Sequence, residues 1–167
     1  MNSLICSIIS DCLNRLDITF YLSKTIPNSF CLGDMEIFKD FTQAAFEQEF
    51  PNQDACLEYL SNLKWGDGFV CRNCGHTHYC QGKSPFSRRC TKCKHLESAT
   101  AHTLFHKCKL PLNEAFGMMH FICRKPGISS YELAKIFNRR QMTCWNLKKK
   151  VKHCLESGGS LLNVSKE

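Results

Sequence analysis

The stretch that decides the fold runs from Cys71-Arg72-Asn73-Cys74-Gly75 to Cys90-Thr91-Lys92-Cys93-Lys94. It places four cysteines in the pattern C-x2-C-x15-C-x2-C. Two residues between paired cysteines let both thiolates of one knuckle face a single ion, and the glycine after the first pair permits the left-handed turn that often follows. Two such knuckles on hairpins complete a tetrahedral shell. The pattern therefore predicts one closed, structural Zn²⁺ site per chain, held by Cys71, Cys74, Cys90 and Cys93.

Other uses of these cysteines stay open at this point. Iron in the same four thiolates has the same spacing, and a redox pair or a metal-free buried cluster is a further alternative, although a redox pair prefers a helix N-terminus behind it. Cys80 lies between the knuckles, where a small strand residue is the favoured interpretation over a ligand. His102, His106 and Cys108 carry ligand chemistry without knuckle spacing, so a second site is disfavoured.

The composition is that of a globular protein. The chain has 167 residues, of which 43% are hydrophobic and 22% charged. Its thirteen cysteines are an odd number, and no convincing signal peptide precedes them, so a reducing compartment and metal binding are favoured over disulfides. Charged residues interrupt the apolar stretch 4–22, which excludes a membrane span there. We expect a cytoplasmic, nucleoid-associated protein with no membrane partner.

The positive charge is concentrated in one part of the chain. Residues 1–50 hold three Lys/Arg against seven Asp/Glu, a net charge of −4. Residues 51–167 hold nineteen against eight, a net charge of +11. An excess so concentrated favours a polyanionic partner for the second part.

Helical patterns flank the cysteine quartet. An amphipathic run starts at Met35 and continues to Phe46, and Asn52 can cap a further helix after Phe50-Pro51. Short β segments follow from 69 to 100, with a turn at residues 82–85. The sequence thus predicts an α+β fold, in which a small antiparallel β zinc ribbon flanked by helices precedes a helical helix-turn-helix module.

Three helices are predicted after the ribbon. The first follows Pro111 and covers about 112–123, and the second begins at the capping box of Ser129 and Glu132 and reaches about residue 137. A tight turn at 138–140 leads into the third, at about 141–156. The expected domains are N-terminal helices at 35–66, the ribbon at 67–108, the helix-turn-helix at 109–157 and a loose tail at 158–167. Residues 1–34 differ in composition, and we expect a poorly ordered extension or an upstream start, with Met35 as the true beginning.

The last helix has two distinct faces. At 100° per residue its buried stripe is Cys144, Leu147, Val151 and Leu155, and the opposite face is rich in amide and ammonium groups. This pattern fits a recognition helix in the major groove of double-stranded DNA, although a solvated surface helix gives the same pattern. The residues expected nearest the bases are Arg139, Arg140, Gln141 and Asn146. Those expected nearer phosphates are Lys149, Lys150 and Lys152.

The order of motifs from Phe50 to about Ser157 resembles the N-terminal zinc-ribbon region of bacterial insertion-sequence transposases of the fifteen-ninety-five group. The resemblance covers roughly two thirds of the chain. Its landmarks, besides the cysteine pairs, include Phe50-Pro51, Ala55-Cys56-Leu57-Glu58-Tyr59-Leu60, Trp65, Asp67-Gly68-Phe69-Val70, Lys109-Leu110-Pro111-Leu112, Gly127-Ile128-Ser129, Leu133-Ala134, and Thr143 with Trp145. The family's turn usually carries glycine and then a small apolar residue, whereas this chain has Asn138 and Arg139. Asparagine can also adopt the left-handed conformation.

The resemblance implies recognition of the terminal inverted repeats of a mobile element. In that family a catalytic domain follows, with acidic residues that bind divalent metal for strand transfer. Here the eight acidic residues after residue 50 are scattered, so we expect no catalytic centre and no small-molecule substrate. The chain would then be a truncated or split transposase, with a catalytic subunit or a second copy as protein partner. The alternatives are a stand-alone DNA-binding regulator and, less favoured, an RNA-binding or protein-docking ribbon.

Overall fold

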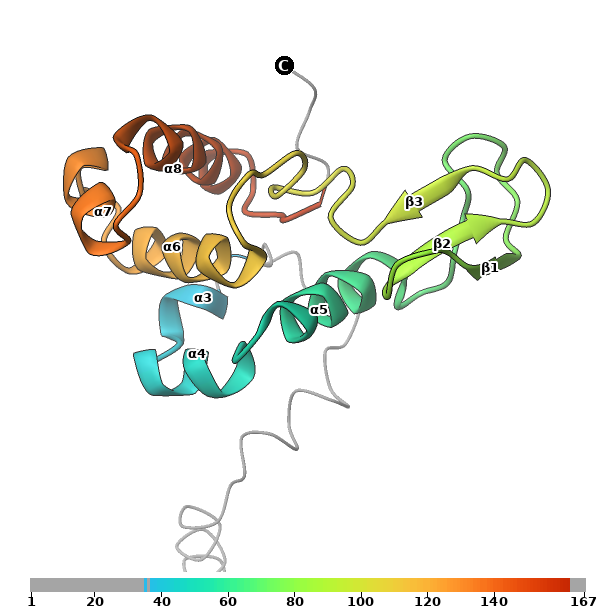
Figure 1. Ribbon diagram of the computed structural model, residues 1–167, viewed down its shortest axis with the longest axis horizontal. Coiled ribbons are helices and arrows are strands. Elements are labelled where there is room, and N and C mark those ends of the chain that lie inside the picture. Colours follow the sequence, from blue (N-terminus) through green and yellow to red (C-terminus); the bar gives the residue numbers. More distant parts are fainter. Residues whose placement is uncertain (1–34, 36, 163–167) are drawn as a thin grey trace, which may run out of the picture. The chain divides into compact units, whose positions relative to one another are not determined.

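The computed structural model describes residues 35 and 37–162, all of which lie within one compact unit, Leu32–Glu167. The extension expected at 1–34 lies outside the described residues. The fold is α+β, as predicted, with helices before and after a small antiparallel sheet (Figure 1). The elements are α3 (Ile37–Asp40), α4 (Gln43–Glu49), α5 (Gln53–Trp65), β1 (Tyr79–Gln81), β2 (Ser87–Cys90), β3 (Leu96–Ser98), α6 (Leu112–Arg124), α7 (Ser130–Ile136) and α8 (Gln141–Glu156).

The amphipathic run that starts at Met35 forms two short helices rather than one. A new N-terminus at Thr42 separates α3 from α4, because the Thr42 hydroxyl accepts the backbone N–H of Ala45 at 3.2 Å. The predicted cap of the next helix is confirmed, since the Asn52 side chain accepts the N–H of Ala55 at 2.9 Å. Each cap satisfies a backbone donor that the first turn of a helix leaves without a partner.

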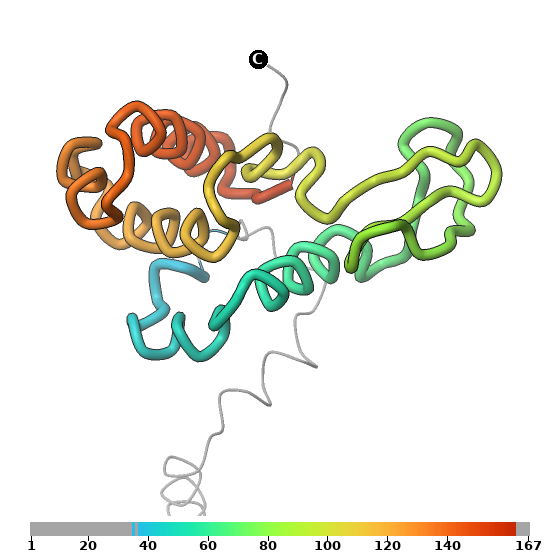
Figure 2. The backbone as a smooth tube through the Cα atoms, in the orientation of Figure 1, coloured from blue at the N-terminus to red at the C-terminus, as the bar shows by residue number. Residues whose placement is uncertain are grey.

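The core of the described residues centres on α6. This helix contacts α3, α5 and α8, and its path between them can be followed in Figure 2. Eight of its thirteen residues are buried. The Phe116 ring stacks on Phe105 with centroids 4.5 Å apart and lies within about 6 Å of Phe38, Phe50 and Tyr59. Phe105 and the fully buried Leu104 come from the segment after β3, which therefore packs on the helices rather than on the sheet.

The three strands pair in the order β1-β2-β3, all antiparallel. The predicted turn at 82–85 joins β1 to β2. The register places Arg89 opposite both Cys80 and Leu96, and Arg88 opposite both Gln81 and Glu97. Since neighbouring residues of a strand point to opposite faces, Arg88 and Arg89 belong to different faces of the sheet.

A buried ion pair joins the sheet to the end of α5. The Lys64 ammonium lies 2.6 Å from a carboxylate oxygen of Glu97, and neither side chain is more than 4% exposed. The same ammonium donates to the carbonyls of Ser98 at 3.0 Å and Ala101 at 2.7 Å. On the same face of the sheet, the Arg88 guanidinium lies over the Trp65 ring, 4.6 Å from its centroid. Polar and cation–π contacts therefore fix the ribbon against α5.

The sequence predicts a loose tail from residue 158, but residues 158–162 are folded. Gly158 and Gly159 have positive φ values of 99° and 68° and turn the chain back after α8. Leu161 is fully buried, and its carbonyl accepts the N–H of Leu104 at 3.0 Å. Burial of this leucine outweighs the polar composition around it. Residues 163–167 lie outside the described part of the chain.

Candidate metal centre and the basic helix

The four predicted metal ligands come together. The sulfur atoms of Cys71, Cys74, Cys90 and Cys93 all lie within 4.8 Å of one another, and no other cluster of three or more ligating side chains is found among the described residues. The Cys71–Cys93 sulfur distance is 3.5 Å and the Cys74–Cys90 distance is 3.6 Å. Zn–S bonds of about 2.3 Å in a tetrahedron require sulfur separations of about 3.8 Å. The quartet therefore has the dimensions of a metal site.

The two knuckles share one backbone arrangement. In each, the N–H of the first cysteine donates to the carbonyl five residues later, and the N–H four residues later donates back to that cysteine's carbonyl. The four distances are between 2.8 and 3.1 Å. Gly75 has a φ of +68°, which confirms the predicted left-handed turn, and Lys94 takes the same position in the second knuckle with a φ of +62°. A left-handed lysine costs roughly 1–2 kcal/mol, and no sequence signal indicated it.

The four cysteines do not share one protonation preference: the pKa values of Cys93 and Cys90 are lowered, whereas burial and hydrogen bonds to the other three sulfur atoms raise that of Cys74 to about 11. Hydrogen bonds from the Asn73 side chain and the His95 backbone lower the pKa of Cys93 to about 6. The thiolate is the form that binds metal. Cys71 and Cys90 are buried and the other two ligands are partly buried, as in a closed structural site. Contrary to the prediction, only the second knuckle lies in a hairpin, between β2 and β3, while the first lies in the irregular segment before β1.

The remaining ligand candidates lie elsewhere. Cys80 is exposed on β1, with its sulfur 3.6 Å from the Arg89 carbonyl and outside the quartet. His102 and His106 stack their rings with centroids 5.5 Å apart. Four further cysteines are buried in the described part of the chain: Cys56, Cys123, Cys144 and Cys154.

The helices α7 and α8 are joined by the short segment 137–140 and pack against each other. The predicted capping box is present, with the Ser129 hydroxyl accepting from the Glu132 N–H at 3.1 Å and the Glu132 carboxylate accepting from the Ser129 N–H at 3.0 Å. Asn138 adopts the left-handed conformation in the turn, with a φ of +48°. The conformation expected for asparagine at this position is therefore observed.

The buried stripe of α8 differs from the prediction in one residue. Cys144, Leu147 and Val151 are buried as expected, but the fourth buried residue is Cys154, and Leu155 is only partly buried. The returning segment after α8 explains the difference, because the Cys154 thiol donates to the Ser160 carbonyl at 2.7 Å and is covered by that segment.

Most of the residues expected to contact DNA are exposed: Arg139, Arg140, Gln141, Asn146, Lys149 and Lys152, with Lys150 partly buried. Some are engaged within the protein. The Arg139 guanidinium donates to Glu114 of α6 at 2.6 and 2.8 Å, and the Lys150 ammonium donates to the His106 carbonyl at 3.1 Å. The side chains of Arg140 and Asn146 have no partner among the described residues.

Two further residues lie on the same exposed face of α8. Trp145 is 48% exposed and Met142 is 66% exposed. The Lys149 ammonium lies 6.0 Å from the centroid of the Trp145 ring. Residues four apart on a helix share a face, so the sequence already places Trp145 beside Lys149. Trp145 was nevertheless not among the predicted DNA contacts.

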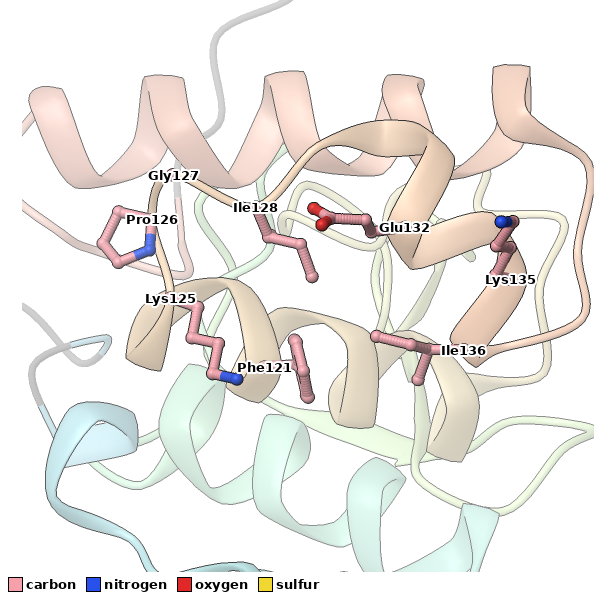
Figure 3. A pocket seen from close by; sticks show the side chains of 8 residues that line it. All are labelled: Phe121, Lys125, Pro126, Gly127, Ile128, Glu132, Lys135 and Ile136. Carbon is pink, nitrogen blue, oxygen red and sulfur yellow. The ribbon is translucent and has the colours of Figure 1, made fainter.

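An open groove that the sequence did not indicate lies between the end of α6 and α7. It has a volume of about 470 Å³, with Phe121, Ile128 and Ile136 as its apolar lining (Figure 3). Lys125, Lys135 and Glu132 form the charged part of the same lining.

Comparison with known proteins supports the assignment of the ribbon. Residues 51–96 match the family model of the transposase zinc-ribbon domain, a stretch that contains α5 and all four ligands. No curated protein and no solved structure matches the chain. None of the helices between residues 37 and 162 combines the length and the apolar character that crossing a bilayer requires.

Proposed function

We propose, from the transposase-type zinc ribbon that residues 51–96 form, that this protein binds duplex DNA at the ends of a mobile element. In this proposal the cysteine quartet holds Zn²⁺, which the closed set of four thiolates suits. With every position taken by sulfur, the ion has no place for water or substrate. It stabilises the ribbon and takes no part in chemistry.

The observation that carries the proposal is the exposed face of α8, which follows the transposase-type ribbon in the same compact unit. The face presents Asn146 and Lys149, and Arg140 precedes it at the N-terminus of the helix. Polar side chains at the start of a recognition helix reach base edges, whereas lysines further along meet phosphates. The helix α7, which begins at its capping box, packs against α8.

The roles of the two residue types differ. The Asn146 amide can pair with adenine through two hydrogen bonds, which discriminates between bases by about 1–3 kcal/mol. The Lys149 ammonium contributes a contact to phosphate that is independent of sequence. Trp145 lies beside them with an indole that can contact a thymine methyl group or the sugar edge.

We further propose that this chain recognises DNA without cutting it, as a truncated or split transposase would. Three described carboxylates serve the fold: Glu97 pairs with Lys64, Glu114 with Arg139, and Glu132 closes the capping box. Strand transfer would then be supplied by an acidic catalytic domain or subunit. A stand-alone regulator is the second candidate, and a neighbouring frame that encodes such a catalytic domain would favour the transposase over the regulator.

The test is a salt series of binding isotherms on a duplex selected from a randomised pool and on its scrambled version. Asn146→Ala should weaken binding to the selected duplex by about 1–3 kcal/mol and hardly affect the scrambled one. Lys149→Ala should weaken both and lower the log–log salt slope by about 0.9. Lys39→Ala, a change to an exposed cation on α3, is the control. If reversing the charges of Lys149 and Lys150 leaves binding intact, α8 is a solvated surface.

A further inference from the structure

We propose that the outer face of the zinc ribbon, which is the face of the sheet that carries Arg89, is a second contact to DNA. Lys83, Arg89 and Lys94 would bind the phosphate backbone of the same duplex there. The inference rests on the proposed DNA binding and adds a surface that the match to the ribbon family does not identify. In this proposal the protein contacts the duplex at two surfaces. The helix α8 contacts the bases, and the ribbon binds the neighbouring phosphates of the DNA backbone.

The three cations line a second groove, which lies on the ribbon and is separate from the groove between α6 and α7. Arg89 is the central residue of the face that it shares with Cys80 and Leu96. Lys83 approaches from the β1–β2 turn, and Lys94 approaches from the second knuckle. Together with Gln81, Gly82 and Leu96 they line a groove of about 410 Å³.

The floor of the groove depends on the absence of a side chain at Gly82. A Cβ at this position would lie 2.6 Å from a terminal carbon of Leu96 and would also collide with the Ser87 side chain. The backbone of the β1–β2 turn thereby approaches β3 closely. The cations at the rim stay open to a ligand from outside.

The two adjacent arginines of β2 have different roles: Arg88 packs within the protein, and Arg89 is accessible to a ligand. Arg88 points to the inner face, where its guanidinium lies 4.6 Å from the Trp65 centroid and 4.2 Å from the Tyr79 centroid. Arg89 is exposed on the outer face, and its side chain has no partner among the described residues. The Lys94 ammonium is oriented by a 2.7 Å hydrogen bond to the Thr91 carbonyl.

The charge of the groove fits a polyanion. No acidic residue lines it, and Glu97 on the neighbouring strand faces the other way and is neutralised by Lys64. Residues 67–108 carry seven Lys/Arg and two Asp/Glu. Four thiolates around a divalent ion contribute about −2, which leaves a positive surplus on the ribbon. An open groove with cations spread along its rim suits a chain of phosphates better than one small enclosed anion, and α8 in the same unit offers the same kind of charge.

The test uses the full chain loaded with zinc and the selected duplex. The groove variant carries Lys83→Gln, Arg89→Gln and Lys94→Asn, since asparagine tolerates the left-handed conformation of residue 94. The control variant removes three exposed cations outside the groove, with Lys39→Gln, Lys109→Gln and Arg124→Gln. Zinc content and melting temperature are measured first, and both variants should match the wild type.

We expect the groove variant to lower the log–log salt slope by about 2–3 and the control variant to change it by less than about one. Hydroxyl-radical footprinting should show loss of one flanking segment of protection while the segment protected by α8 stays. An unchanged slope and footprint, with Asn146→Ala still lowering affinity, would overturn the groove and leave the proposed function standing.

Other outcomes of the same experiments distinguish DNA binding by the groove from DNA binding by α8. If the groove variant loses affinity while Asn146→Ala and Lys149→Ala do not, the ribbon is the DNA contact, and the role of α8 is refuted. If the wild type binds no duplex, both proposals fail. If the groove variant binds DNA normally but loses self-association in sedimentation, the groove binds protein and the inference is wrong.

Discussion

Arg139 donates two hydrogen bonds to the carboxylate of Glu114, from Nε at 2.8 Å and from Nη2 at 2.6 Å. The pair ties the turn before α8 to α6, 25 residues earlier in the chain. A guanidinium held in this two-pronged way is oriented by the protein. Its neighbour Arg140 carries the same charge without a partner among the described residues.

The two arginines should therefore behave differently. Arg140→Ala is expected to weaken DNA binding several-fold with little change in melting temperature, whereas Arg139→Ala should mainly lower the melting temperature. Binding isotherms and thermal unfolding of both variants check this difference. An equal loss of affinity in the two variants would show that the Glu114 pair opens on DNA and frees Arg139 for it.

The metal site should contain one Zn²⁺ per chain. Cys74→Ser should lose the ion and unfold the ribbon, because metal binding in such sites contributes folding energy on the order of 10 kcal/mol. Cys80→Ser is the matched control, since this exposed cysteine lies outside the quartet and should leave the content at one. Elemental analysis and circular dichroism give the readouts. A metal content near zero with an unchanged fold after chelation would contradict the site.

The buried pair of Lys64 and Glu97 should be costly to break. Glu97→Gln leaves a nearly inaccessible ammonium without its counter-ion, and a loss of about 3–5 kcal/mol in the free energy of unfolding is expected. The double variant Lys64→Met, Glu97→Gln removes the charge and should recover part of that loss. Urea unfolding of the wild type, the two single variants Glu97→Gln and Lys64→Met, and the double variant measures the coupling. Additive effects of the two substitutions would mean that the ammonium is stabilised by the Ser98 and Ala101 carbonyls instead.

The capping box at the start of α7 should make the stability of the folded protein depend on pH. The hydrogen bond from the Ser129 backbone is the main cause that lowers the pKa of Glu132 below its ordinary value of 4.5. A carboxyl group with a lowered folded pKa stabilises the protein above its ordinary value and loses that contribution as the pH falls through the lowered one. Glu132→Gln should thus be less stable than wild type at pH 7 and equally stable well below pH 4. Glu58→Gln, on the exposed side of α5, is the control.

Purified protein should not cleave or join DNA with Mg²⁺ or Mn²⁺ present. The expectation follows from the described residues, in which the cysteine quartet is the only cluster of ligating side chains found and Glu97, Glu114 and Glu132 already have partners within the fold. Incubation with a supercoiled plasmid and with a duplex bearing element ends provides the measurement. Cleavage that disappears when an acidic residue of this chain is mutated would refute the proposal.

The features predictable from sequence are those set by a few neighbouring residues. The C-x2-C spacing indicated the four ligands, the caps at Asn52 and Ser129 indicated helix starts, and the period after the turn indicated α8 at its observed bounds. Each knuckle and each cap depends on contacts within about five residues along the chain, where side-chain type dictates geometry.

What the sequence did not predict depends on contacts between distant residues. The tie between Arg139 and Glu114, the burial of Leu161, and the groove built by Lys83, Arg89 and Lys94 all require the tertiary fold. The break between α3 and α4 is an exception, because the Thr42 cap is local, whereas the prediction for this run used only its apolar period. The left-handed Lys94 is set by the knuckle and not by its own preference.

The backbone hydrogen bond between Leu104 and Leu161 has an evolutionary consequence. The isolated bridge between Thr103 and Leu162 lies beside it, so the chain enters and leaves the segment that holds α6, α7 and α8 at one point. A segment whose two ends meet can be excised or inserted without stretching its host, as domain insertions and circular permutations require. The ends of the three-helix segment are therefore suited to joining it to other sequences, but a new partner would have to replace the packing of α6 on α3 and α5.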